Sequence, residues 1–200
     1  MKGIKTVAVR VGNAVIGGGA PVLVQSMTTT SPKDVEGSAK QIIELSNAGC
    51  ELVRITVPTL ADAEKLKEIS EKVRSAGVKI PLSADIHYQP KAAFEALKWV
   101  EKVRINPGNF VTDKEKIAES FAPFVKEAKR LGRAIRIGVN HGSLSARILE
   151  KYGNTPLGMV ESALEYLSVC EAENFDQVVF SLKASRPKEM VEANRLMAER

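Results

Sequence analysis

Cationic side chains interrupt four short apolar segments of the sequence, and their types suit the binding of an anion. Arg54, Arg104 and Arg136 each lie within a β-branched segment, and Lys183 ends another. A guanidinium group matches phosphate oxygens in its planar geometry, and lysine adds a compact charge. If these cations face one enclosed space, Asp85 is the carboxylate that we expect beside them. Since a buried cation without a partner is costly, an anionic ligand with two or more charges is the simplest counterpart. The alternative is that one or two of the arginines lie at a solvated rim.

Two polar pairs accompany these cations. Asp85 and His87 are two positions apart, so they point to the same side of a strand. They are candidate catalytic residues, because such a pair can orient a substrate hydroxyl or pass a proton near neutral pH. Alternatively, they form a structural hydrogen-bonded pair.

Asn106 and Asn140 end two further strands, in the sequences N-P-G and N-H-G-S. Their side chains can bind substrate hydroxyls, or they cap the turns that follow.

The cysteines offer no nucleophile or metal site. Cys50 and Cys170 are far apart, without the short spacings of a metal-binding or disulfide framework. We expect both to be buried thiols. No nucleophile with an adjacent base emerges, so acyl transfer is poorly supported.

Short β-branched segments alternate with longer segments of helical periodicity, six times over. The expected strands are 22–27, 52–57, 80–87, 103–107, 135–140 and 178–183. The expected helices are 34–48, 60–76, 90–100, 113–131, 157–173 and 187–200. Because a helix separates each pair of strands, the strands are expected to be parallel.

The strand spacing favours a barrel of the (β/α)₈ TIM type, truncated after about six βα units. The repeat is about 31 residues, and eight repeats plus the leading segment need about 270, which is typical of that fold. Within each strand, polar and charged residues alternate with aliphatic ones. A barrel with a polar interior accommodates this pattern, whereas an open sheet, the alternative, has helices burying its charged face.

The N-terminal segment 1–21 is expected to form a hairpin and a connection, and 22–200 the six βα units. The hairpin turns at Gly12 and Asn13, between V-A-V-R-V and A-V-I. We expect it to plug the N-terminal end of the barrel. The three consecutive glycines at 17–19 do not match a phosphate-binding loop.

Composition excludes several classes of protein. Of the 200 residues, 44% are hydrophobic and 26% charged, which is typical of a globular protein and not of a disordered one. No apolar stretch approaches the roughly 20 residues that a membrane span needs. The net charge of +5 is spread along the chain without basic blocks, so nucleic acid is not an expected partner. No signal peptide is recognisable, and a cytoplasmic location is expected.

Seven ordered motifs resemble the GcpE/IspG family of 4-hydroxy-3-methylbut-2-enyl diphosphate synthases. They are Q-S-M-T-T-T (25–30), A-G-C-E-L-V-R-I-T-V-P (48–58), A-D-I-H (84–87), V-R-I-N-P-G-N (103–109), R-I-G-V-N-H-G-S-L (136–144), L-E-K-Y-G (149–153) and S-L-K-A-S (181–185). The resemblance implies the isoprenoid-pathway reduction of 2-C-methyl-D-erythritol 2,4-cyclodiphosphate. It also implies that the substrate-binding residues are Arg54, His87, Arg104, Asn106, Arg136, Asn140 and Lys183, with Asp85 as a polar partner.

The resemblance further implies a 4Fe-4S cluster, reduced by flavodoxin or ferredoxin, in a homodimeric full-length protein. In that family a C-terminal domain supplies three cysteines and a glutamate to the cluster, and the barrel has two further strands. The sequence to Arg200 contains no match to these ligands, so this chain alone is expected to bind no metal and to be inactive. Two alternatives stay open at this point: a barrel similar to dihydropteroate synthase, and a non-catalytic anion-binding module.

Overall fold

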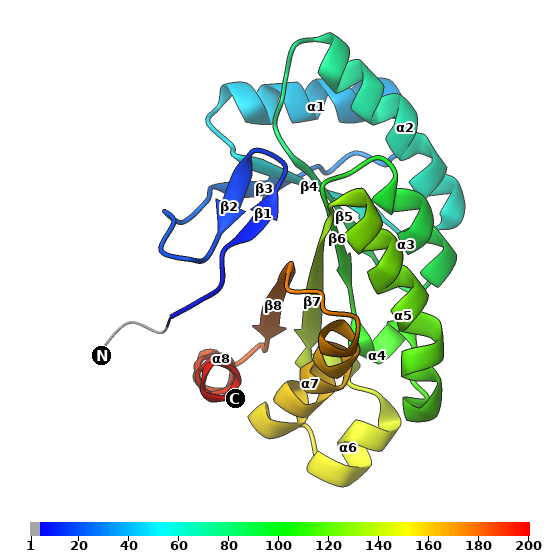
Figure 1. The fold of residues 1–200 in the computed structure, drawn as a ribbon. Helices are drawn as coiled ribbons and strands as arrows, with labels where there is room; N and C mark the ends of the chain where they lie inside the picture. The colour runs from blue at the N-terminus through cyan, green and yellow to red at the C-terminus, as the bar shows by residue number, and fades with distance from the viewer. Residues whose placement is uncertain (1–4) are drawn as a thin grey trace.

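The computed structural model describes residues 5–200 and contains a curled sheet of six parallel strands, with helices on its outer side (Figure 1). The strands are β3 (Gln25–Met27), β4 (Leu52–Val57), β5 (Leu82–Ile86), β6 (Lys102–Ile105), β7 (Ala134–Asn140) and β8 (Val178–Lys183). They pair in the order β3-β4-β5-β6-β7-β8, and every neighbouring pair is parallel. This arrangement confirms the predicted fold, a TIM-type barrel truncated after six units.

All six predicted helices form, with ends within a few residues of those expected. They are α1 (Val35–Asn47), α2 (Leu60–Ser75), α3 (Pro90–Leu97), α5 (Lys114–Leu131), α7 (Pro156–Ala172) and α8 (Pro187–Glu199). Capping hydrogen bonds stabilise the first turns of several helices. At α2, the Thr59 side chain accepts from the backbone N–H of Asp62, and the Asp62 carboxylate accepts from the backbone N–H of Thr59. None of the helices within residues 5–200 is both long and apolar enough to cross a lipid bilayer.

Two short helices and a 3₁₀ turn were not predicted. Helix α4 (Pro107–Phe110) and the 3₁₀ turn His141–Ser143 follow strands β6 and β7, and helix α6 (Ala146–Tyr152) comes next. Helix α4 and the 3₁₀ turn occupy the N-P-G and N-H-G-S segments, where turn-forming residues indicated loops. Elements this short carry too little periodicity for detection from sequence.

Strand boundaries differ from prediction for local reasons. Residues 22–24 precede β3, and Val22 and Val24 are exposed. Strand β5 begins at Leu82, since Pro81 lacks the backbone N–H of a regular ladder residue. Strand β6 begins at Lys102, one residue earlier than predicted.

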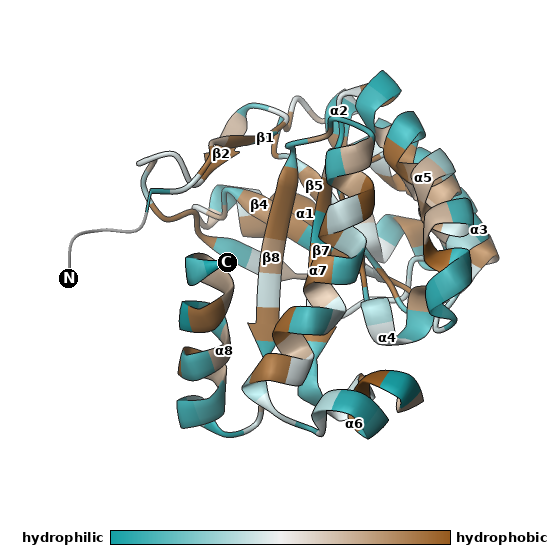
Figure 2. Ribbon diagram, turned by 60° about the horizontal axis from the view of Figure 1, so that its bottom comes forward, coloured by the Kyte–Doolittle hydropathy of each residue, from teal (hydrophilic) through white to brown (hydrophobic). Residues whose placement is uncertain are grey.

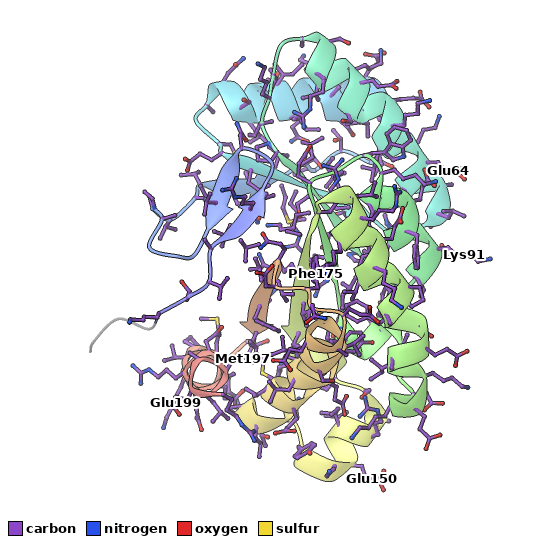
Figure 3. The ribbon with its side chains drawn as sticks, viewed as in Figure 1. Glu64, Lys91, Glu150, Phe175, Met197 and Glu199 are labelled. Atoms are coloured by element: carbon purple, nitrogen blue, oxygen red, sulfur yellow. The ribbon has the colours of Figure 1, made fainter. Side chains whose placement is uncertain are left out.

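The aliphatic face of the sheet packs against the helices and forms the main core. Ile55, Ala84, Val103 and Ile137 are fully buried there, one from each of the four central strands. In Figure 2 the strands are largely hydrophobic in colour, whereas α8 alternates between hydrophobic and hydrophilic. Charged side chains such as Glu64 and Lys91 project outward from the helical layer (Figure 3).

The N-terminal hairpin forms as predicted and covers one end of the sheet. Strands β1 (Val9–Val11) and β2 (Ala14–Ile16) are antiparallel, and Gly12 takes a positive φ of 61° in the turn. Val9 and Val11 are buried against Leu52 and Ala134, the first residues of β4 and β7. The hairpin therefore closes the N-terminal end of the strands, as a plug.

The outer edge of β8 has no neighbouring strand within residues 5–200. A pocket of about 770 Å³ lies along it, between the hairpin, α7 and α8. Phe175 and Met197, labelled in Figure 3, are among its lining residues.

Candidate functional site

The strand register places the predicted site residues on one face of the sheet, the side turned away from the helices, which we call the lumen face. In this register Arg54 is opposite Ser83, and Arg104 is opposite Arg136. Opposed residues of neighbouring strands point to the same side. The lumen face therefore carries Arg54, Ser83, Asp85, Lys102, Arg104, Arg136, Gly138, Asn140, Ser181 and Lys183.

Asp85 is the centre of this group and is only 5% exposed. Its Oδ1 accepts a hydrogen bond from Arg104 Nη1 at 3.0 Å, and its Oδ2 accepts one from Arg54 Nη2. His87 Nε2 lies 3.6 Å from the same Oδ2. Asp85 thus lies beside the cations as expected, and its one carboxylate serves two of the arginines.

Arg104 is fixed from two sides. Its Nη2 donates to the backbone carbonyl of Gly138 at 2.6 Å, while its Nη1 is bound to Asp85. A Cβ at position 138 would lie well inside 3.0 Å of Arg104 Nε, so the glycine makes room for this side chain. Burial lowers the pKa of Arg104, and Asp85 partly offsets that effect.

Arg136 and Lys183 are the cations of the predicted set that have no partner. Within residues 5–200, neither side chain makes a hydrogen bond or ion pair with the protein. Burial first, and then the charges of Arg54 and Arg104, lower the pKa of Arg136 to about 10. Lys183 is exposed at the end of β8, beside Asn140. These two cations have donors available to an external anion.

The structure adds one cation that sequence analysis missed. Lys102 is 1% exposed, and its Nζ donates to Gln25 Oε1 at 3.2 Å. Burial first, and then the charges of Arg136 and Arg54, lower its pKa to about 7. Lys102 is two positions before Arg104, so the alternation of side chains along the strand places both on the same face. It was missed because the predicted strand began one residue too late.

The two asparagines cap the turns that follow their strands. Asn106 is 5% exposed; its Oδ1 accepts from Gly108 N at 3.1 Å and its Nδ2 donates to Ser143 Oγ at 2.8 Å. Asn140 Oδ1 accepts from Gly142 N at 3.2 Å. Asn106 thus joins the loops after β6 and β7. A role for either residue in ligand binding stays a prediction.

The cysteines do not contribute to this face. Cys50 Sγ donates to the carbonyl oxygens of Leu52 and Val24 at 3.2 and 3.4 Å. Cys170 is buried in α7, and burial raises the pKa of its thiol to about 12, so it is not a thiolate near neutral pH. Within residues 5–200, no three His, Cys, Asp or Glu side chains are grouped to hold a metal ion.

Sequence comparison relates nearly the whole chain to one family. Residues 6–200 match the GcpE TIM-barrel domain. A 4-hydroxy-3-methylbut-2-en-1-yl diphosphate synthase (flavodoxin) of Leptospira interrogans is 48% identical over 212 residues, covering 98% of this chain and 32% of that protein. The corresponding synthase (ferredoxin) of Trichormus variabilis is 48% identical over 214 residues, covering 98% and 52%. The chain therefore spans about a third to a half of the length of these curated relatives.

Solved structures share the fold at low sequence identity. A truncated 3-deoxy-D-arabino-heptulosonate 7-phosphate synthase from Thermotoga maritima superposes with a TM-score of 0.61 at 10% identity, covering 96% of this chain and 65% of that one. Dihydropteroate synthase from Thermus thermophilus superposes with a TM-score of 0.51 at 18% identity, covering 88% and 64%. At such identities the likeness concerns the fold alone.

Proposed function

Since the chain belongs to the GcpE TIM-barrel domain family, we propose that it is the substrate-binding barrel of a 4-hydroxy-3-methylbut-2-en-1-yl diphosphate synthase. Relatives at 48% identity carry that name. The observation that supports the proposal best is the charge of the lumen face, where, within residues 5–200, five basic side chains accompany a single carboxylate, that of Asp85.

The proposed substrate is 2-C-methyl-D-erythritol 2,4-cyclodiphosphate. Each of its phosphorus atoms carries one ester and one anhydride link, which leaves one negative charge on each phosphate. In our proposal Arg136 and Lys183 bind these phosphates, because none of residues 5–200 accepts a hydrogen bond from their side chains. Arg54 and Arg104 add donors from a fixed position beside Asp85.

Asp85 and His87 take different roles in this proposal. Both oxygens of Asp85 accept from arginines, so its carboxylate orients cations. His87 is partly exposed and adjoins Asp85, where it can donate a proton to a leaving hydroxyl. The overall reaction adds two electrons and two protons, opens the cyclic diphosphate ring and releases one hydroxyl as water.

The residues described here do not fit a 4Fe-4S cluster. Cys50 and Cys170 lie on different elements, and burial keeps Cys170 protonated. We propose that the cluster of this family is held by residues outside 5–200 and is reduced by flavodoxin or ferredoxin, the donors in the names of the relatives. A homodimer and a cytoplasmic location stay predictions.

Calorimetric titration of the protein at its natural full length tests the substrate proposal. We expect heat with the cyclic diphosphate and none with a pterin, the ligand class of the dihydropteroate synthase alternative. Arg136→Met should weaken binding about 10- to 150-fold, the value of one charge-assisted hydrogen bond. Arg130→Met, on the outer surface of α5, should bind as the wild type does. Binding of pterin, or equal affinity in the Arg136 variant, would contradict the proposal.

Reductive turnover separates an enzyme from a non-catalytic anion-binding module. The natural full-length protein should convert the cyclic diphosphate when supplied with reduced flavodoxin or ferredoxin. Iron binding without conversion of the cyclic diphosphate would refute the proposed activity.

A further inference from the structure

Lys102 extends across the base of the lumen face, from β6 toward β3. Its Nζ reaches Gln25 Oε1, three strands away in the sheet order. Ala134, which is opposite Lys102 in the register, packs with Val9 and Val11 of the hairpin. Because Lys102 is 1% exposed, its amine cannot be solvated by bulk water, and Gln25 is its one protein acceptor among residues 5–200.

Two hydrogen-bond donors near Lys102 have no acceptor among residues 5–200. Ser83 is opposite Lys102 in the register, and its buried Oγ has no partner within the described chain. Arg54 is opposite Ser83, and its buried Nε also has none. Buried polar groups are normally satisfied, so a set of unpaired donors indicates a missing acceptor.

The charges around Lys102 are predominantly of its own sign. The strands that line the lumen face carry these other charged or titratable groups: Arg54 on β4, Asp85 on β5 with His87 directly after it, Arg104 on β6, Arg136 on β7 and Lys183 on β8. Gln25 on β3 is neutral. Asp85 is already shared between two arginines. Among residues 5–200, an ammonium group at this position therefore has no carboxylate of its own as a counterion.

We propose that Lys102 is a further anion-binding residue of the lumen face, and that its amine takes up one proton as the cyclic diphosphate binds. The inference rests on the proposed function, and it adds to that function one anion-binding residue and one proton that is taken up on binding. The proton passes from solvent to Nζ, and no covalent bond of the ligand forms or breaks.

Electrostatics supports both halves of this proposal. Burial and the neighbouring arginines hold the pKa of Lys102 near 7, so much of the amine is neutral in the empty site. Two negative phosphates raise that pKa, because an opposite charge favours the protonated form. The cyclic diphosphate has no group that titrates near neutral pH, so a proton taken up on binding enters the protein.

Calorimetry in buffers of different ionisation enthalpy tests this on the protein at its natural full length. The wild type should take up about 0.9 proton per bound ligand at about pH 8, and its affinity should fall about eightfold between about pH 7.5 and pH 8.5.

Lys102→Met supplies the matched comparison. It should bind the ligand more weakly near pH 7, without the extra proton and without the eightfold pH dependence. Lys98→Met, on the outer surface at the end of α3, should behave as the wild type. Binding by the wild type without proton uptake, or unchanged uptake in the Lys102 variant, overturns this inference and leaves the proposed function standing. No binding at all by the wild type overturns the proposed function, and the inference with it.

Discussion

Gly138→Ala should weaken anion binding by displacing Arg104. The new Cβ would overlap Arg104 Nε, with Cγ and Cζ of the same side chain at 3.1 and 3.2 Å. Position 138 lies within strand β7, so the backbone cannot withdraw without disturbing the ladder to β8. The arginine must therefore leave its present position between Asp85 and the carbonyl of Gly138.

The loss of affinity for the anion depends on the contacts that position the guanidinium group of Arg104. It forfeits the 2.6 Å hydrogen bond to Gly138 O, and its 3.0 Å bond to Asp85 is strained or lost. Once displaced, the guanidinium group also loses its charge-assisted hydrogen bond to the bound anion in the proposed complex, which contributes about 1.5–3 kcal/mol. We therefore expect the dissociation constant for the cyclic diphosphate to rise about 10- to 150-fold, measured by calorimetric titration.

Gly142→Ala is the control for this change. A Cβ there would meet only Asn140 Oδ1, at 3.8 Å, which is ordinary contact. Its affinity should match the wild type, and circular dichroism should show both variants folded. A folded Gly138→Ala protein that binds with wild-type affinity would refute the argument that this glycine positions Arg104.

Two further predictions concern stability. Because the pKa of Lys102 is near 7 in the folded chain and near 10.4 when unfolded, the unfolded chain binds more protons between these values, and wild-type stability gains about 1.4 kcal/mol per pH unit from this group. Lys102→Met lacks that gain. The free energy of unfolding of the wild type, measured with urea, should therefore rise relative to that of the variant by roughly 2–3 kcal/mol between about pH 7.5 and 9.5; a difference that does not change with pH would contradict this. Gly108→Ala would drive a Cβ into the backbone carbonyl of Ser143, so it should lower the free energy of unfolding by about 3 kcal/mol or more. A thermal midpoint equal to that of the wild type would disprove the close approach of these loops.

Much of the fold was predictable because its signals are periodic. The alternation in 52–57 assigned Arg54 to one face and Ile55 to the other, and the structure buries Ile55 against the helices. The hairpin at Gly12 was readable from its turn residues. The short helix after Asn106 was not, because a four-residue element is decided by capping contacts and not by periodicity.

Which of these residues share the lumen face was predictable from the sequence, and how their side chains pair was less so. Sequence parity placed Arg54, Arg104 and Asp85 on one face, which the register confirms. It could not show that Asp85 would bind both arginines, because that depends on the curvature of the sheet and the reach of long side chains. Lys102 was missed because the strand begins one residue earlier than its β-branched run indicates.

The double attachment of Arg104 has a consequence for the rates of ligand exchange. An arginine that folding has already immobilised loses little rotamer entropy when a guest arrives, whereas the exposed Lys183 gives up its mobility at that moment, at a cost of about 0.5–1.5 kcal/mol. The immobilised Arg104 thus favours slow dissociation of the ligand, whereas the mobile Lys183 favours faster dissociation. Mutation of Lys183 should consequently alter the residence time of the ligand without changing which ligand is bound.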